Sequence, residues 1–274
     1  MSNSLKEITL IFSENPIARA YLYLLIKKKL FSNKFNYLNN KIIFNKFFLK
    51  LRYYSTFKKT LGYLKSKEIL ILIKEIEEYF NLEKDFLIDM YTFENIYKLK
   101  NIEFAKHQDI NNELNIEYFK SLKEKNFLNT SNRIFKSILD TNKNFYHIHP
   151  GYMYKVRGAD GTLNSIKYYD NVGATFFLMD NKIDNGKIIE RFERNFKKIY
   201  FPDSLKLKTH DLYNIWFSFF DPAIRVFLLN KMLSDDISLV DYKNINLSKE
   251  ENNYYKFINK SELRDLFINK IFFD

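Results

Sequence analysis

The chain has 274 residues, no cysteine, 46% hydrophobic and 28% charged residues, and a formal net charge of +11. This balance excludes a disordered chain and suits one main globular domain with an appended piece. The lack of cysteine excludes disulfides and thiolate metal sites and is compatible with a reducing cytoplasm. The positive charge favours an anionic partner without choosing among phosphate-bearing small molecules, nucleic acid and an acidic membrane.

The amino-terminal region has the pattern of a strand followed by a helix. Ile8 to Phe12 is a compact apolar run, and Pro16 stands at the start of an amphipathic segment from Ile17 to Leu30. Doubly wound α/β domains begin in this way. Charged residues interrupt the apolar runs, so we expect neither a signal peptide nor a transmembrane helix, and predict a cytoplasmic protein without integral membrane association.

A basic segment follows, from Lys27 to Lys67, with twelve Lys or Arg and no acidic residue. Its interleaved Phe, Tyr and Leu predict a helical insertion whose aromatic side chains pack inward and whose lysines face water. A weak docking surface for an anion is the alternative, although no nucleic-acid-binding module is recognisable and nucleic acid is not the expected partner.

The middle of the chain alternates between the two periodicities of helix and strand. The expected order is helix 69–80, strand 102–105, helix 115–122, strand 127–129, helix 133–139 and strand 145–149. This rhythm predicts a mostly parallel sheet with right-handed crossovers. Ligands of such sheets bind at the carboxyl ends of the strands, where His147 and His149 fall.

Five of the six glycines lie between Tyr146 and Ile189, which indicates that this stretch builds a site. His147 and His149 are two apart on a strand and therefore share a face. A second strand is expected over 174–179, followed by a polar turn containing Asp180 and Asp184. A carboxylate from that turn meets the histidines if the two strands are neighbours.

These motifs together resemble a known family. The ordered set is His149-Pro150-Gly151, Arg157-Gly158-Ala159, Gly173-Ala174-Thr175, Met179-Asp180 and Ile183-Asp184-x-Gly186-x-Ile188-Ile189. It is similar to the catalytic half of the folate-dependent formyltransferases, which include methionyl-tRNA, glycinamide ribonucleotide and sugar N-formyltransferases. The spelling His-Pro-Gly favours the sugar enzymes. The resemblance implies a Rossmann-type α/β fold over residues 1–200 and transfer of a formyl group from N10-formyltetrahydrofolate to an amine.

The resemblance also implies roles for particular residues. The family's catalytic triad is Asn, His and Asp. Its His matches His149, which would stabilise the oxyanion or shuttle a proton, and its Asp matches Asp184, which would orient His149 and accept the amine proton. His147 stands where the family has Asn, and we expect it to substitute as the oxyanion donor. The residues expected near the folate are Gly151, Tyr152, Arg157, Gly158 and Asp180, the last of them capping the turn.

The region from Phe201 to Asp274 is expected to be a small, mainly helical segment on the acceptor side or at a homodimer contact. Thr209 to Leu233 has a helical pattern, and Asp221-Pro222 predicts a break near Phe220 with a new helix after it. Arg225 suits either a phosphate or an ion pair with Asp221 or Asp235. A capping box is expected from Ser248 to Glu251, then a strand over 254–258 and a helix over 259–272.

Two other functions remain open beside formyl transfer to a nucleotide-linked amino sugar. Loss of the Asn allows a catalytically altered or inactive protein of the same fold that only binds ligand. A His-x-His pair with a carboxylate also matches a metal site, but the Pro-Gly and Arg-Gly-Ala motifs have no role in one, so no metal is expected. The acceptor itself is not determined by these motifs.

Overall fold

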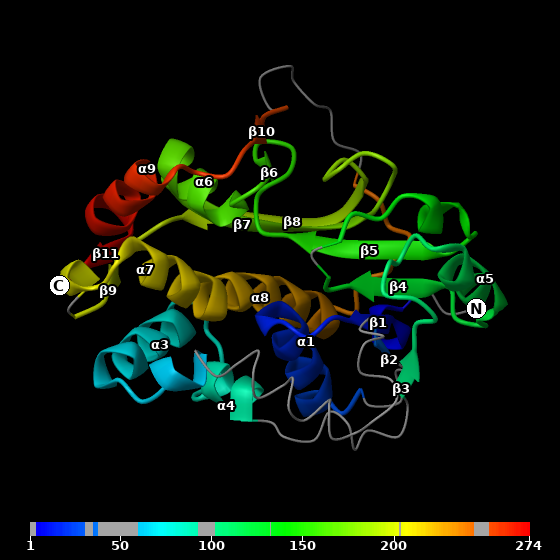
Figure 1. The fold of residues 1–274 in the computed structure, drawn as a ribbon, viewed down its shortest axis with the longest axis horizontal. Coiled ribbons are helices and arrows are strands. Elements are labelled where there is room, and N and C mark those ends of the chain that lie inside the picture. Colours follow the sequence, from blue (N-terminus) through cyan, green and yellow to red (C-terminus); the bar gives the residue numbers. More distant parts are fainter. Residues whose placement is uncertain are drawn as a thin grey trace.

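A computed structural model describes residues 4–30, 35–37, 60–92, 102–131, 133–202, 204–243 and 252–274. Its centre is a mixed sheet of order β3-β2-β1-β4-β5-β7-β8 (Figure 1). The strands are β1 Thr9–Phe12, β2 Phe35–Tyr37, β3 Ile102–Phe104, β4 Asn126–Asn129, β5 Asn144–His149, β7 Asn171–Leu178 and β8 Lys187–Asn195. The first five are mutually parallel, as predicted, whereas β7 runs antiparallel to β5, and β8 to β7.

Helices cover both faces of the sheet. They are α1 Pro16–Lys27, α3 Lys67–Tyr79, α4 Phe86–Thr92, α5 Glu113–Ser121, α6 Gly161–Tyr169, α7 Thr209–Ile215, α8 Asp221–Ser234 and α9 Lys260–Asp265. In Figure 1, α1, α7 and α8 form a layer beneath the sheet, and α3 and α4 lie beyond that layer. The opposite face is covered at α5, whose Phe119 packs with Phe127 and Phe145 of the strands.

Two short strand pairs connect the carboxyl-terminal end of the chain to the α/β unit. These pairs are β6 (Arg157–Gly158) with β10 (Tyr254–Tyr255), and β9 (Ile199–Tyr200) with β11 (Phe272–Phe273). The largest cluster of buried apolar side chains joins Leu10 and Phe176 of the sheet to Ile224 of α8 and Phe267 near the carboxyl end. Residues 201–274 therefore share the core of the α/β unit.

The expected helical break near Phe220 is wrong. Trp216–Phe220 forms a π-helical turn that joins α7 to α8 without interruption, and Phe220 has helical backbone angles. Proline lacks an N–H and its ring clashes with the preceding turn of an ideal helix, and the wider π turn accommodates Pro222. The Asp221 carboxylate binds Arg225 instead of capping the helix.

The helix expected over 133–139 is also wrong, because only a 3-10 turn forms, at Ser137–Asp140. The Asn111 side chain donates to the Ile134 carbonyl and accepts from the Lys136 N–H. A side chain that takes up backbone groups in this way competes with the helical bonds.

Only part of the basic segment 27–67 is described. Phe35–Tyr37 forms strand β2 beside β1, so at this point the expected helix is wrong. Residues 31–34 and 38–59, and the capping box from Ser248 to Glu251, lie outside the described residues. The later strand is shorter than expected, at Tyr254–Tyr255. The helix expected over 259–272 is present: Asn259 is the N-cap of α9, and the π-helical segment Leu266–Ile271 continues α9 without a break.

Candidate active site

Strand β5 carries both histidines to the carboxyl end of the parallel strands, the end at which open α/β sheets bind ligands. Its pairing with β7 places His149 opposite Thr175, and the loop between β7 and β8 carries Asp184 back to His149. The two residues expected to react therefore meet: Nδ1 of His149 lies 3.6 Å from Oδ2 of Asp184. The Asp184 Oδ2 also accepts the Gly158 N–H at 3.0 Å, which fixes the carboxylate.

The tautomer of His149 follows from its partner. Nε2 lies 3.1 Å from the Val156 carbonyl, which only accepts, so Nε2 carries the proton and donates. A neutral His149 therefore presents the lone pair of Nδ1 to Asp184. Burial lowers the pKa of His149, and the Asp184 carboxylate opposes that change. The pair is arranged to take up one proton between ring and carboxylate.

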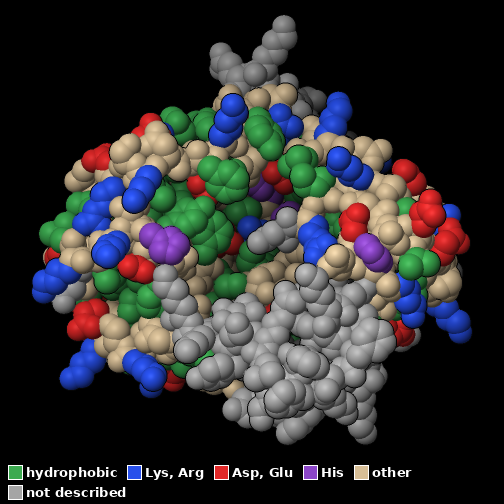
Figure 2. All heavy atoms as spheres, viewed as in Figure 1, with side chains coloured by type: hydrophobic (Ala, Val, Ile, Leu, Met, Phe, Trp, Pro, Cys, Tyr) green, Lys and Arg blue, Asp and Glu red, His purple; other side chains and the backbone are tan. Residues whose placement is uncertain are grey.

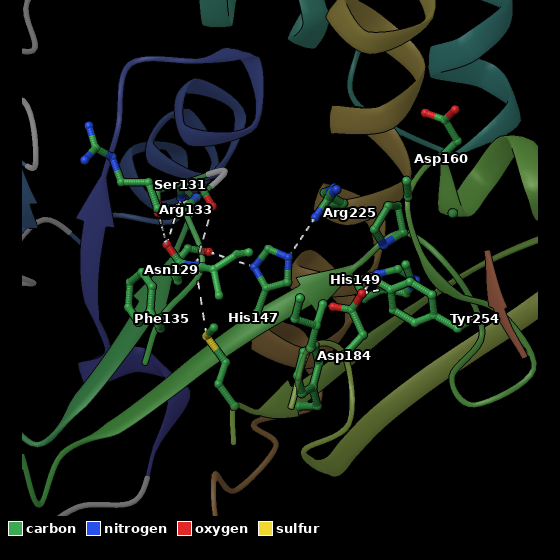
Figure 3. Close-up of a pocket in the computed structure, with 18 of the residues that line it drawn as sticks. Asn129, Ser131, Arg133, Phe135, His147, His149, Asp160, Asp184, Arg225 and Tyr254 are labelled. Carbon is green, nitrogen blue, oxygen red and sulfur yellow. Dashed lines mark hydrogen bonds and ion pairs between the residues drawn. The ribbon is translucent and has the colours of Figure 1, made fainter. Parts of the chain in front are cut away.

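His147 is held differently. Its Nδ1 donates to the backbone carbonyl of Asn129 at 3.2 Å, and its Nε2 lies 3.5 Å from Nη1 of Arg225 (Figure 3). Burial first, and the positive charge of Arg225 second, lower the pKa of His147 from 6.5 to about 4, against the opposing effect of Asp184. Both ring nitrogens are therefore engaged, and the imidazole is neutral near pH 7.

A cavity of about 430 Å³ opens over these residues. Figure 2 shows it as a hollow near the middle of one face, with histidine atoms deep inside. Polar groups from the ends of β4 and β5, the β7–β8 loop and the start of α6 line it together with aromatic rings from the last third of the chain. Among the lining residues are Asn129, Ser131, Arg133, Asp180, Lys182, Asp160, Phe217, Tyr254 and Phe257.

The glycines of this stretch permit close approach. A Cβ on Gly151 would lie 2.8 Å from Nε2 of His149 and 3.0 Å from the Val156 carbonyl oxygen. Gly158 has a φ of +90°, and a Cβ there would lie 2.3 Å from the Tyr255 carbonyl oxygen. The concentration of glycine thus lets the backbone pack around the histidine ring.

The residues expected near the folate are distributed unevenly. Gly158 and Asp180 line the cavity, and Asp180 accepts from the Lys182 N–H within its own turn. Gly151, Tyr152 and Arg157 are absent from the described cavity lining. The Tyr152 ring stacks under Arg191 at 4.0 Å, and Arg157 donates to the Asn185 side chain.

The sequence predicts for Arg225 either a phosphate contact or an ion pair with Asp221 or Asp235, and it gives neither Arg225 nor Asp221 a place beside the histidines. Nε of Arg225 lies 2.9 Å from Oδ2 of Asp221, both residues are buried, and both line the cavity. Nη1 of Arg225 also donates to the carbonyl of Ile148, between the two histidines. The sequence feature that could have indicated their burial beside the site is a pair of opposite charges four residues apart within a mostly apolar helix.

The metal alternative finds no support in the geometry. Across the described ranges, no three His, Cys, Asp or Glu side chains converge as metal ligands.

Within the same ranges, none of the helices combines the length and apolar character that crossing a bilayer requires.

Comparison with known proteins gives matches at the level of structure. No family model and no curated protein matches the sequence. A sugar N-formyltransferase from Shewanella sp. FDAARGOS_354 matches over 97% of this chain and 92% of its own, with a TM-score of 0.50 and 17% identity. An N-formyltransferase from Helicobacter canadensis, solved with folinic acid and dTDP-3-aminofucose, matches over 95% and 79%, with a TM-score of 0.46 and 14% identity.

A phosphoribosylglycinamide formyltransferase from Streptococcus pneumoniae TIGR4 matches over 84% of this chain and 97% of its own, with a TM-score of 0.46 and 10% identity. The match to the Shewanella enzyme defines the class: the chain has the formyltransferase fold. The resemblance found in the sequence motifs is confirmed at that level.

Proposed function

We propose that this protein transfers a formyl group from N10-formyltetrahydrofolate to an amine, and that the amine belongs to a nucleotide-linked amino sugar. The observation that carries the proposal is the meeting of His149 and Asp184 at the floor of a cavity on the formyltransferase fold. A fold alone does not imply an activity, but a histidine and a carboxylate in contact can accept a proton, which supports the proposal.

The reaction proceeds through a tetrahedral intermediate and requires two proton transfers. The amine nitrogen bonds to the formyl carbon, and the carbonyl electron pair moves to the formyl oxygen, which becomes an oxyanion. The amine then loses a proton, and the electron pair on the oxyanion re-forms the carbonyl as the bond from the formyl carbon to N10 breaks. N10 leaves with the bonding pair and takes up a proton. The chain must hold the reactants, stabilise the oxyanion and move these protons.

The His149–Asp184 pair suits the proton transfer. With Nε2 donating to Val156, the lone pair of Nδ1 and the Asp184 carboxylate face each other. A proton taken from the amine is therefore shared between them and then passed to N10. His149 thus acts as the shuttle, while the Gly158 N–H holds Asp184 in place.

The cavity supports the choice of substrates. Its polar side, with Asn129, Ser131 and the β7–β8 loop, offers hydrogen-bonding groups for a flat donor ring, and Tyr254 and Phe257 offer faces on which an acceptor nucleobase can stack. The net charge of +11 favours phosphate-bearing acceptors.

The test is to incubate the protein with N10-formyltetrahydrofolate and a panel of nucleotide-linked amino sugars. We expect mass spectrometry to show one added formyl group, and the variants His149→Ala and Asp184→Asn to lose that product. If wild-type protein binds folate but formylates no amine, and His147→Asn gains activity, the protein is a ligand-binding member of the fold.

A further inference from the structure

The substituted triad position lacks a free donor. His147 gives its Nδ1–H to the Asn129 carbonyl, and His149 gives its Nε2–H to the Val156 carbonyl. In the neutral state neither imidazole has a second N–H to offer. An Asn at position 147 would supply an amide donor, so the change to His removes one and something else must stabilise negative charge on the formyl oxygen.

Arg225 is the cation in contact with this position. Among the basic side chains lining the described cavity, Arg133, Lys182 and Arg225, it is the one whose nitrogen lies within 3.5 Å of His147. It is only 6% exposed and is anchored at three points: the Asp221 carboxylate, the Ile148 carbonyl and the His147 ring. A guanidinium stays charged throughout the accessible pH range, and in a buried site its field is weakly screened.

We propose that Arg225, held by Asp221, is a positioning residue for His147 that fixes the ring as its neutral Nδ1–H tautomer and supplies the positive field that the missing Asn donor would have provided. A guanidinium 3.5 Å from Nε2 requires a lone pair there, so the proton stays on Nδ1. No proton leaves Arg225 or His147 during transfer, and the proton steps remain with His149 and Asp184.

The surroundings of His147 shift its pKa in two opposite directions. Burial, Arg225 and His149 lower its pKa, whereas Asp184 and the bond to Asn129 raise it. Removal of the Arg225 charge leaves Asp184 as the main charged neighbour, which favours protonation of the ring. The protonation state of His147 therefore depends on Arg225 of α8, a helix distant from it in sequence.

This inference rests on the proposed function only where it concerns the oxyanion, so the test has two arms. The first arm is an NMR titration of labelled histidine, with the His147 signals assigned by His147→Asn. We expect a single Nδ1–H tautomer in wild type. In Asp221→Asn/Arg225→Met, which removes both buried charges together, the pKa of His147 should rise by about one unit and its tautomers should mix.

The second arm is kinetic. We expect Arg225→Met and the double variant to lower kcat by about 10²-fold with little change in KM, and Arg225→Lys to recover part of the loss because it keeps the charge. Arg194→Met is the matched control. Arg194 is a half-buried arginine that stacks on Tyr79 and Phe80 away from the cavity, and its loss should change stability but neither the His147 titration nor kcat.

An unchanged His147 titration in the double variant, with the protein folded, overturns the inference. So does an unchanged kcat in a variant whose His147 titration has shifted, because the field would then have no effect on the reaction. If the titration shifts as expected while wild type forms no product, the control of His147 by Arg225 stands and the proposed function is the part that fails.

Discussion

Asp184 reaches His149 from the loop beyond the neighbouring antiparallel strand, and its Oδ2 lies 3.6 Å from Nδ1 of the ring. Because Nε2 is committed to the Val156 carbonyl, the facing atoms are a lone pair and a carboxylate. In the proposed mechanism the pair holds one proton, and loss of the Asp184 charge should remove that capacity while the cavity keeps its shape.

Asp184→Asn should lower kcat by about 10²- to 10⁴-fold, the usual contribution of general acid–base catalysis, with a small change in the KM for the folate donor. Asp184 has a φ of +49°, which asparagine tolerates, so the variant should fold. Steady-state kinetics and circular dichroism test both parts. Asp170→Asn is the matched control, since Asp170 also has a positive φ of +50° but lies at an exposed helix end. Equal losses in the two variants would contradict the prediction.

Gly151→Ala should disturb His149 itself. The added Cβ would lie 2.8 Å from Nε2 and 3.0 Å from the Val156 carbonyl oxygen, so the ring must shift and its bond to that carbonyl should weaken. We expect a stability loss of about 1 to 3 kcal/mol, typical of overpacking, together with a large loss of kcat. Urea unfolding and kinetics measure the two effects. Gly62→Ala is the control: its new Cβ meets nothing within 4 Å, and because the position is helical, stability should be unchanged or slightly higher. If Gly151→Ala kept the stability and kcat of wild type, the close packing around His149 would be contradicted.

The stability of the protein should depend on pH through His147. Its pKa falls from 6.5 to about 4 on folding, so between these values the unfolded chain binds more protons than the folded one. The free energy of unfolding should decrease as pH falls from 6.5 to 4, by at most about 3 kcal/mol from this residue, and this contribution should be constant above 6.5. His149 acts in the same direction. Urea unfolding at several pH values should show a shallower dependence in His147→Asn; an equal slope would contradict the prediction.

Much of this architecture could be predicted because its determinants are local. The alternating helices and strands that lead to His149, and the polar turn that contains Asp184, are each recognisable in a short stretch of sequence. The order and spacing of the motifs indicated that the two segments belong to one site. The contact between Arg225 and His147 could not be predicted, because it depends on where α8 packs on the sheet. The π turn before Pro222 and the side-chain bonds of Asn111 also override local signals through tertiary contacts.

The division at residue 200 suggested by the sequence can be tested with Trp216, the only tryptophan. It lies in the π turn, its indole N–H donates to Thr162 of α6 at 3.1 Å, and it stacks on Phe220 at 3.8 Å. Since one cluster of buried side chains joins this helix to the sheet, unfolding should be cooperative. The urea midpoint by tryptophan fluorescence should then equal the midpoint by circular dichroism.

A matched variant sharpens this prediction. Thr162→Val removes the acceptor of the indole N–H at nearly constant volume and should lower the free energy of unfolding by about 1 to 2 kcal/mol. In a single cooperative unit, both midpoints must shift together. If fluorescence alone shifted, or if its transition preceded the loss of helical signal in wild type, residues 201–274 would unfold separately. The Asp221–Arg225 pair would then leave β5 while the sheet persisted, and His147 would lose its partner before the fold was lost.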